Sequence, residues 1–244
     1  MKTIGLIGGL SWESTAVYYK MINEQVRERR GGLCSAPILL HSFDFAEIVR
    51  LQQDGAWNEA AQTLARAGRQ LCDGGAGCLA ICTNTMHKVA AEVAEAAPSG
   101  IPLLHIGDAV GAAVRAAGIE RVALLGTRYT MEQPFLADYL RDRYALSVLI
   151  PSDGERDAIH NIIFEELCRG IVRAESRQCL KEIALRLRQE KKAEGVVLGC
   201  TELMLLIGED TGSFPLRRFD TTALHASAIV EFALASAPAE TVHR

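Results

Sequence analysis

The chain has 244 residues, of which 49% are hydrophobic, and its formal net charge is −4. This length is enough for one large or two smaller domains. The acidic balance argues against a nucleic-acid-binding surface, which needs a basic patch, but it is compatible with an acidic small substrate in a locally cationic pocket. The opening MKTIGLIGGL is too short and glycine-rich for a signal peptide, and no segment approaches the roughly 18 apolar residues of a membrane span. We therefore expect a cytoplasmic protein.

The seven cysteines are an odd number spread along the chain, which does not indicate a disulfide framework in that compartment. Cys72, Cys78 and Cys82 also lack the spacing of a zinc site, so we expect no metal. GLIGG (5–9) brings a glycine turn to the end of a predicted strand but lacks the dinucleotide-binding spacing, so we expect no cofactor. Most of the cysteines are predicted to be small core residues.

Strands and helices alternate along the chain, which predicts an α/β fold with parallel sheets and helices on both faces. Ser11 is placed as the N-cap of the first helix, and Asp44, Asp108 and Asp220 are interpreted as further helix caps. The predicted strands are 3–8, 37–43, 78–82, 121–126, 146–151, 195–199 and a short one within 214–220. The predicted helices follow Ser11 and cover 55–73, 86–97, about 108–117, 130–143, about 155–169, 173–192 and 221–235.

An internal repeat is visible in this pattern. TIGLIGGLS aligns with RVALLGTRYT, which matches Gly8 to Gly126, and LAICTNT aligns with VVLGCTE, which matches Thr83 to Cys200. The two offsets differ by one residue, which indicates two related α/β halves. Because ligands bind at the carboxyl ends of parallel strands, Thr83 and Cys200 are predicted to approach one ligand from opposite sides.

Cys200 follows a fully apolar strand and precedes ELMLLI, so it is predicted to lie at an exposed strand end just before a helix. Free backbone N–H groups at that helix start would lower the pKa of the thiol. The Thr83-Asn84-Thr85 loop has two interpretations: its side chains cap the following helix, or its backbone N–H groups hold a carboxylate. The histidines share no spacing, and His105 is the best outside candidate because it lies at the end of a further predicted strand, PLLHI (102–106).

The chain resembles the aspartate/glutamate racemases, which are cofactor-independent enzymes. The resemblance rests on Gly8-Gly9, Asn84-Thr85, LLGT at 124–127 with Thr130, and GCTE at 199–202. The strings SWEST, CTNTMHK, LLGTRYTMEQ and FEELC resemble the branch specific for L-aspartate and L-glutamate. This resemblance implies two pseudo-symmetric three-layer α/β domains with mainly parallel sheets, an active site in the cleft between them, and a homodimer.

We place the N-terminal domain at 1–103 plus 214–244 and the C-terminal domain at 104–213, with the final segment packing back on the first domain. The family ordinarily has one cysteine in each half. Anchoring the alignment on Asn84-Thr85 puts the first of these positions on Thr83, while Cys200 matches the second. Since strand side chains alternate faces, Cys82 is predicted to point into the core.

The resemblance implies that Cys200 takes the Cα proton of the L-isomer and that Thr83 delivers or relays a proton on the other face. Asn84, Thr85 and Thr201 are candidates for the substrate's α-carboxylate, and Thr127 lines the site. Gln52 and the turn at Leu10-Ser11 are candidates for the distal end of the substrate. Arg50 and Arg128 could pair with a side-chain carboxylate, although a solvated surface position is the better interpretation of each.

Three alternatives stay open. A single cysteine is what arylmalonate-decarboxylase-like enzymes use to protonate a carbanion from one face. A non-catalytic amino-acid-binding protein would explain Thr83 as the mark of a lost activity. A racemase of broader specificity is also compatible with the sequence, because no cation is firmly placed for the distal carboxylate.

Overall fold

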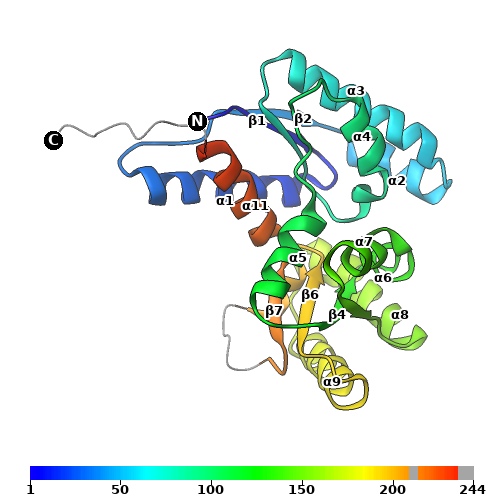
Figure 1. Ribbon diagram of the computed structural model, residues 1–244. Helices are drawn as coiled ribbons and strands as arrows, with labels where there is room; N and C mark the ends of the chain where they lie inside the picture. Colours follow the sequence, from blue (N-terminus) through cyan, green and yellow to red (C-terminus); the bar gives the residue numbers. More distant parts are fainter. Residues whose placement is uncertain (209–213, 236–244) are drawn as a thin grey trace. The chain divides into compact units, whose positions relative to one another are not determined.

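The computed structural model describes residues 1–208 and 214–235, and the chain divides into two units (Figure 1). The first unit contains Met1–His105 and the chain from His225 onward, and the second contains Ile106–Leu224. Within the described ranges, no helix combines the length and apolarity needed to cross a bilayer.

The first unit is built on a parallel sheet with the strand order β2–β1–β3. A further parallel bridge joins Leu79 to Leu103 beside β3. Successive side chains of β1 and β3 enter different apolar cores, one on each face of the sheet. The strands are β1 (Ile4–Gly8), β2 (Ile38–Ser42) and β3 (Cys78–Ile81).

Helices cover both faces of this sheet (Figure 1). The core on one face is filled from α1 (Trp12–Arg30) and α11 (Thr221–Leu234). The core on the other face is filled from α2 (Phe45–Gln53), α3 (Trp57–Asp73), the 3₁₀ helix η1 (Thr85–Val89) and α4 (Ala90–Ala96). Helix α11 begins in the second unit and continues in the first, where its described residues from Ala226 to Ala233 contribute to this core.

The second unit has a parallel sheet of order β5–β4–β6–β7. Its strands are β4 (Arg121–Gly126), β5 (Ser147–Leu149), β6 (Gly195–Gly199) and β7 (Arg217–Asp220). One face packs on α5 (Ile106–Ala116) and α7 (Pro134–Tyr144). The other face packs on α6 (Arg128–Glu132), α8 (Asp153–Asn161), the π-helix η2 (Ile162–Glu166), the 3₁₀ helix η3 (Leu167–Arg169), α9 (Ala174–Lys191) and α10 (Leu203–Ile207).

The two units share one topology, which confirms the α/β fold with a repeat. In each, the first strand of the unit is central and the third lies beside it: β2–β1–β3 corresponds to β5–β4–β6. Leu103 extends the first sheet next to β3, as β7 extends the second next to β6. Gly8 and Gly126 therefore end equivalent strands, and Thr83 and Cys200 follow equivalent strands.

The division of the chain differs from the predicted boundaries in one segment. The prediction assigned 214–244 to the first domain, but β7 pairs with β6, so Phe214 through Leu224 belong to the second unit. The first unit ends at His105 where the prediction ended it at position 103. Residues 209–213 and 236–244, which fell within the predicted domains, lie outside the described residues.

Two further local predictions need correction. The predicted helix 130–143 is two helices, because Pro134 begins α7 and disfavours a helical conformation at Gln133 before it. Asp108 lies inside the first turn of α5 and accepts a hydrogen bond from the Tyr144 hydroxyl at 2.7 Å, so it is not the predicted cap. Asp44 and Asp220 do cap, since each side chain accepts a backbone N–H of the next helix.

Candidate active site

The carboxyl end of β1 turns sharply into α1. Gly9 has a φ of 73°, and a Cβ there would collide with the backbone of Phe43, so only glycine fits. Its N–H donates to Thr15 Oγ1 at 2.9 Å. Ser11 is the N-cap of α1, as predicted, and its hydroxyl accepts from the Ser14 N–H at 3.2 Å. Leu10 is buried in the apolar core, so this turn offers its backbone and Ser11 to a ligand.

The carboxyl end of β3 carries the Thr83 loop. Cys82 is fully buried in the core shared with α1 and α11, and burial raises the pKa of its thiol, as expected of a core cysteine. Thr83 is partly exposed, Asn84 is 6% exposed and Thr85 begins η1. Among the described residues η1 has no side-chain cap, so the capping interpretation of this loop is not supported for Asn84.

Gln52 lies beside this loop. It is the penultimate residue of α2, and its Nε2 is 3.1 Å from Sδ of Met86, the second residue of η1. The structure therefore brings Gln52 next to the Thr83 loop, although the two lie far apart in the sequence. Strands β1 and β3 are parallel neighbours. The Leu10-Ser11 turn after β1 therefore lies at the same carboxyl edge of the sheet as the Thr83 loop after β3.

The equivalent edge of the second unit carries Thr127 and Cys200. Gly126 and Gly199 end the neighbouring strands β4 and β6 and are partners in register. A Cβ on Gly126 would lie 3.1 Å from the Gly199 carbonyl oxygen, and one on Gly199 would lie 2.9 Å from the Thr130 side chain. Thr127 caps α6, with its hydroxyl 3.2 Å from that of Thr130. The two glycines thus allow Thr127 and Cys200 to emerge from adjacent strand ends.

The Cys200 sulfur lies against a carboxylate. Its S–H donates to Glu202 Oε2 at a distance of 2.9 Å. Burial and the Glu202 charge raise the pKa of this thiol, which contradicts the predicted lowering by a helix start. The reason is local: α10 has only five residues and begins at Leu203, while the Glu202 side chain folds back onto the sulfur. Cys200 therefore rests as a thiol with a proton acceptor in contact.

The two arginines considered for the distal carboxylate lie at the surface. Arg128 pairs with Asp157, and both side chains are about half exposed. Arg50 is exposed near the end of α2. The surface interpretation of both residues therefore agrees with the structure.

Thr201 completes the set of predicted site residues. It is partly buried, follows Cys200 directly, and its carbonyl accepts the N–H of Met204 at 3.3 Å. The predicted residues thus fall into one group in each unit, at the carboxyl edge of its sheet. The contact of Glu202 with the Cys200 sulfur was not predicted, although the position of Glu202 two residues after Cys200 is visible in the sequence.

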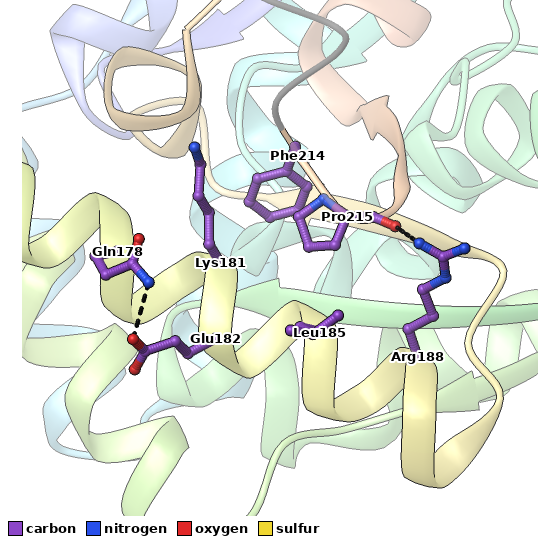
Figure 2. Close-up of a pocket in the computed structure, with 7 residues that line it drawn as sticks. All are labelled: Gln178, Lys181, Glu182, Leu185, Arg188, Phe214 and Pro215. Atoms are coloured by element: carbon purple, nitrogen blue, oxygen red, sulfur yellow. Dashed lines mark hydrogen bonds between the residues drawn. The ribbon is translucent and has the colours of Figure 1, made fainter.

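A separate groove of about 360 Å³ lies in the second unit between α9 and the segment before β7 (Figure 2). Arg188 donates to the Pro215 carbonyl at 3.2 Å, and Gln178 donates to Glu182 at 2.9 Å (Figure 2). None of the described residues that line this groove is a predicted site residue. Its lining residues are Gln178, Lys181, Glu182, Leu185, Arg188, Phe214 and Pro215.

Comparison with known proteins agrees with this arrangement. The sequence model of the Asp/Glu/hydantoin racemase family matches residues 7–229. The chain belongs to this family. Among solved structures, the chain is similar to a Yersinia pestis protein given the provisional name Asp/Glu racemase, with 46% identity and a TM-score of 0.89. That match covers 96% of this chain and 100% of the other.

Two further solved structures are similar to the chain. An aspartate racemase homologue from Pyrococcus horikoshii OT3 is 33% identical, with a TM-score of 0.84 over 96% of this chain and 99% of the other. Unliganded arylmalonate decarboxylase is 15% identical, with a TM-score of 0.56 over 97% of this chain and 95% of the other. The second likeness is one of fold alone.

Proposed function

We propose that this member of the racemase family interconverts the L- and D-isomers of aspartate or glutamate in the cytoplasm, without pyridoxal phosphate or another cofactor. The observation that carries the proposal is the pair Thr83 and Cys200. These residues follow equivalent strands of two α/β units with one topology, in a chain whose family and neighbours are racemases. The acidic substrate is the one named for those neighbours.

Racemisation removes the Cα proton from one face of the substrate and returns a proton to the other. Cys200 is the proposed base for the L-isomer. Its proton passes to Glu202, with which it is already hydrogen-bonded, and the resulting thiolate takes the Cα–H as the substrate carbanion forms. The contact with Glu202 thus supplies the activation that the raised pKa of the thiol requires.

Thr83 is the proposed proton donor on the opposite face. A hydroxyl is too weak an acid to ionise unaided, but a carbanion is basic enough to take its proton, directly or through a bound water. Solvent then restores the threonine proton. Cys200 and Thr83 therefore have unequal roles, which distinguishes this chain from a racemase with two cysteines.

The carbanion needs electrostatic stabilisation, because the Cα–H beside an ammonium group is a very weak acid. Asn84, Thr85 and Thr201, with the backbone N–H groups around them, are the proposed donors to the α-carboxylate. Gln52 and the Leu10-Ser11 turn are proposed for the distal end of the substrate, with Thr127 on the side of Cys200. The contact between Gln52 and Met86 supports the assignment of Gln52, because it places this side chain beside the Thr83 loop.

The test is incubation of L- and D-aspartate and L- and D-glutamate in deuterated water. We expect solvent deuterium at Cα of the product enantiomer, and we expect none with Cys200→Ser. A complete lack of exchange in the wild type would favour a non-catalytic binding protein. Exchange across many other amino acids would favour a racemase of broader specificity, and release of carbon dioxide from an arylmalonate would favour the decarboxylase.

A thermodynamic limit sharpens the test of Thr83. Enantiomers have equal free energies, so kcat/KM must be equal in the two directions, and a preference for the L-isomer means that kcat and KM differ together. Thr83→Cys places on the D-face a group that can ionise and then take the Cα proton of the D-isomer, and we predict that it raises the kcat for the D-isomer. Unchanged D-isomer turnover in a folded Thr83→Cys variant would show that Thr83 does not have this role.

A further inference from the structure

Behind the Thr83 loop lies a group of rings that the proposed reaction does not use. His87 and His225 are almost completely buried, and their ring centroids are 5.7 Å apart. His105 is 4.6 Å from His87, and Tyr18 is 5.6 Å from His225. The four rings come from η1, the segment before α5, α11 and α1, so this part of the first unit joins distant parts of the chain.

The hydrogen bonds of this group assign the ring protons. His87 Nδ1 is 2.7 Å from the Thr83 carbonyl oxygen, and a carbonyl only accepts, so Nδ1–H donates. His225 Nε2 likewise donates to the Leu104 carbonyl at 2.7 Å, which leaves its Nδ1 to accept from the Tyr18 hydroxyl at 2.9 Å. Burial lowers the pKa of both histidines, that of His225 to about 4, so both are neutral around pH 7.

These contacts fix the backbone on both sides of Thr83. The peptide that precedes Thr83 is held by the Ser14 hydroxyl, which donates to the Cys82 carbonyl at 3.1 Å. The peptide that follows it is held by the His87 ring at the Thr83 carbonyl. That second peptide also carries the N–H of Asn84, one of the proposed donors to the substrate carboxylate. Both the direction of the Thr83 side chain and that of this N–H therefore depend on buried side chains beneath the loop.

We propose that His87 is a positioning residue for Thr83, supported by Ser14 on the other side of the loop. The inference rests on the proposed racemase function and deepens it: the two proton-transfer steps depend on different parts of the first unit. The step at Cys200 does not require this loop geometry for its base. The step at Thr83 requires this loop geometry, because displacement of a catalytic group by about 1 Å can lower the rate about 10²-fold.

The two steps can be measured separately. Racemisation of L-glutamate or L-aspartate needs both faces. Release of chloride from the same amino acid carrying chlorine at Cβ needs only removal of the Cα proton. In that reaction the Cα–H goes to Cys200, the carbanion electrons form a Cα–Cβ double bond, chloride leaves, and the enamine hydrolyses to a 2-oxo acid and ammonia. The ratio of the two rates therefore reports on the Thr83 face.

We expect His87→Leu, which fills a similar volume but loses the donor, to lower the kcat of racemisation at least about tenfold more than it lowers chloride release. Chloride release loses only the share of carbanion stabilisation that comes from the Asn84 N–H. His87→Asn keeps a donor at the position of Nδ1 and should restore most of the racemisation. Ser14→Ala removes only the hydroxyl that donates to the Cys82 carbonyl, and it should lower the ratio of racemisation to chloride release as His87→Leu does. It replaces His87→Leu as the test if that variant does not fold. Val93→Ala removes a fully buried side chain of α4 and is the control for lost stability alone.

The inference is overturned if His87→Leu and Ser14→Ala lower both rates by one factor, as Val93→Ala does, or change neither. It is also overturned if His87→Asn behaves as His87→Leu. Failure of the proposed function has a different outcome, because the wild type itself would then incorporate no deuterium at Cα. The inference would fall with the function in that case.

Discussion

At the scale of single residues, the contact between Cys200 and Glu202 decides how the thiol is activated. Two effects of Glu202 oppose each other: its charge raises the pKa of the thiol, and its carboxylate is placed to accept the proton. Glu202→Gln removes both. If Glu202 acted only through its charge, Glu202→Gln would raise activity at neutral pH by making the thiolate more available.

We predict the opposite result, a loss of about 10²-fold in kcat for Glu202→Gln, because the base is lost. The apparent pKa of Cys200, measured from the pH dependence of alkylation by iodoacetamide, should fall in the same variant. Cys200→Ser gives the background from the other cysteines. Glu190→Gln, an exposed change on α9, is the matched surface control. A rise in kcat would show that the carboxylate is not the proton acceptor.

The position of Cys200 could be predicted from the sequence, but the direction of its pKa shift could not. An apolar strand followed by GCTE is enough to place the sulfur at a strand end. The pKa depends on the balance between burial, which raises it most, the neighbouring Glu202 carboxylate, which also raises it, and a helix start, which would lower it. That balance is set by the length of α10 and by how the Glu202 side chain folds, neither of which a periodicity shows.

At the scale of elements, α11 is fixed to the first unit by an apolar face and by one histidine. Ala226, Ile229 and Val230 enter the core, while His225 bonds Tyr18 of α1 and the Leu104 carbonyl. With a pKa of about 4 in the folded chain, His225 stays neutral as the pH falls below its ordinary 6.5, whereas the unfolded chain takes up a proton. Stability is therefore fully present above pH 6.5 and declines toward pH 4.

We predict that the free energy of unfolding falls by about 3 kcal/mol between pH 6.5 and pH 4 because of His225 alone. Each unit of difference between its pKa in the unfolded and folded chain corresponds to about 1.4 kcal/mol. The lowered pKa of His87 acts in the same direction, and His105 and Tyr18 are further titratable groups beside these rings. Urea unfolding at a series of pH values measures the slope. His225→Asn should be less stable at neutral pH but should show a shallower dependence. An equal slope in both proteins would contradict the assignment.

The accuracy of the predicted elements followed the amount of apolar surface that each buries. The buried strands and the long helix α3 have a strong pattern and were predicted closely. Helix α2 was missed, although Asp44 was recognised as a cap, because only Ile48 and Leu51 of its nine residues are buried. The assignment of β7 to the first domain failed for another reason: which strand pairs with which is a tertiary choice.

At the scale of the whole molecule, the repeat allowed two related α/β units to be predicted from two short alignments, although not the order of their strands. Equivalent glycine turns and equivalent polar loops recur because each unit needs the same close approach at its strand ends. Helix α1 has an exposed apolar surface. Trp12 is 66% exposed and Tyr19 is 55% exposed, and with Ala16 they lie on one face of the helix.

We propose that this face of α1 forms a homodimer. Two copies of α1 packed antiparallel about Ala16 would place Trp12 of one copy beside Tyr19 of the other, and Glu13 beside Lys20, so the face is complementary to itself in shape and charge. Trp12→Ser combined with Tyr19→Ser should give a monomer in light scattering coupled to size exclusion. Leu185→Ser, which changes another exposed apolar residue on α9, should leave the mass unchanged.

Charge reversal separates this arrangement from a general loss of apolar surface. Lys20 pairs with Glu24 of its own helix at 2.7 Å, but both side chains are exposed, so Lys20 is still available to a second copy. Glu13→Lys or Lys20→Glu alone should weaken association, because each places like charges together twice across the two-fold axis. The two changes combined restore opposite charges and should restore the dimer. If the combined variant dissociates further than either single variant, the antiparallel pairing of α1 is wrong.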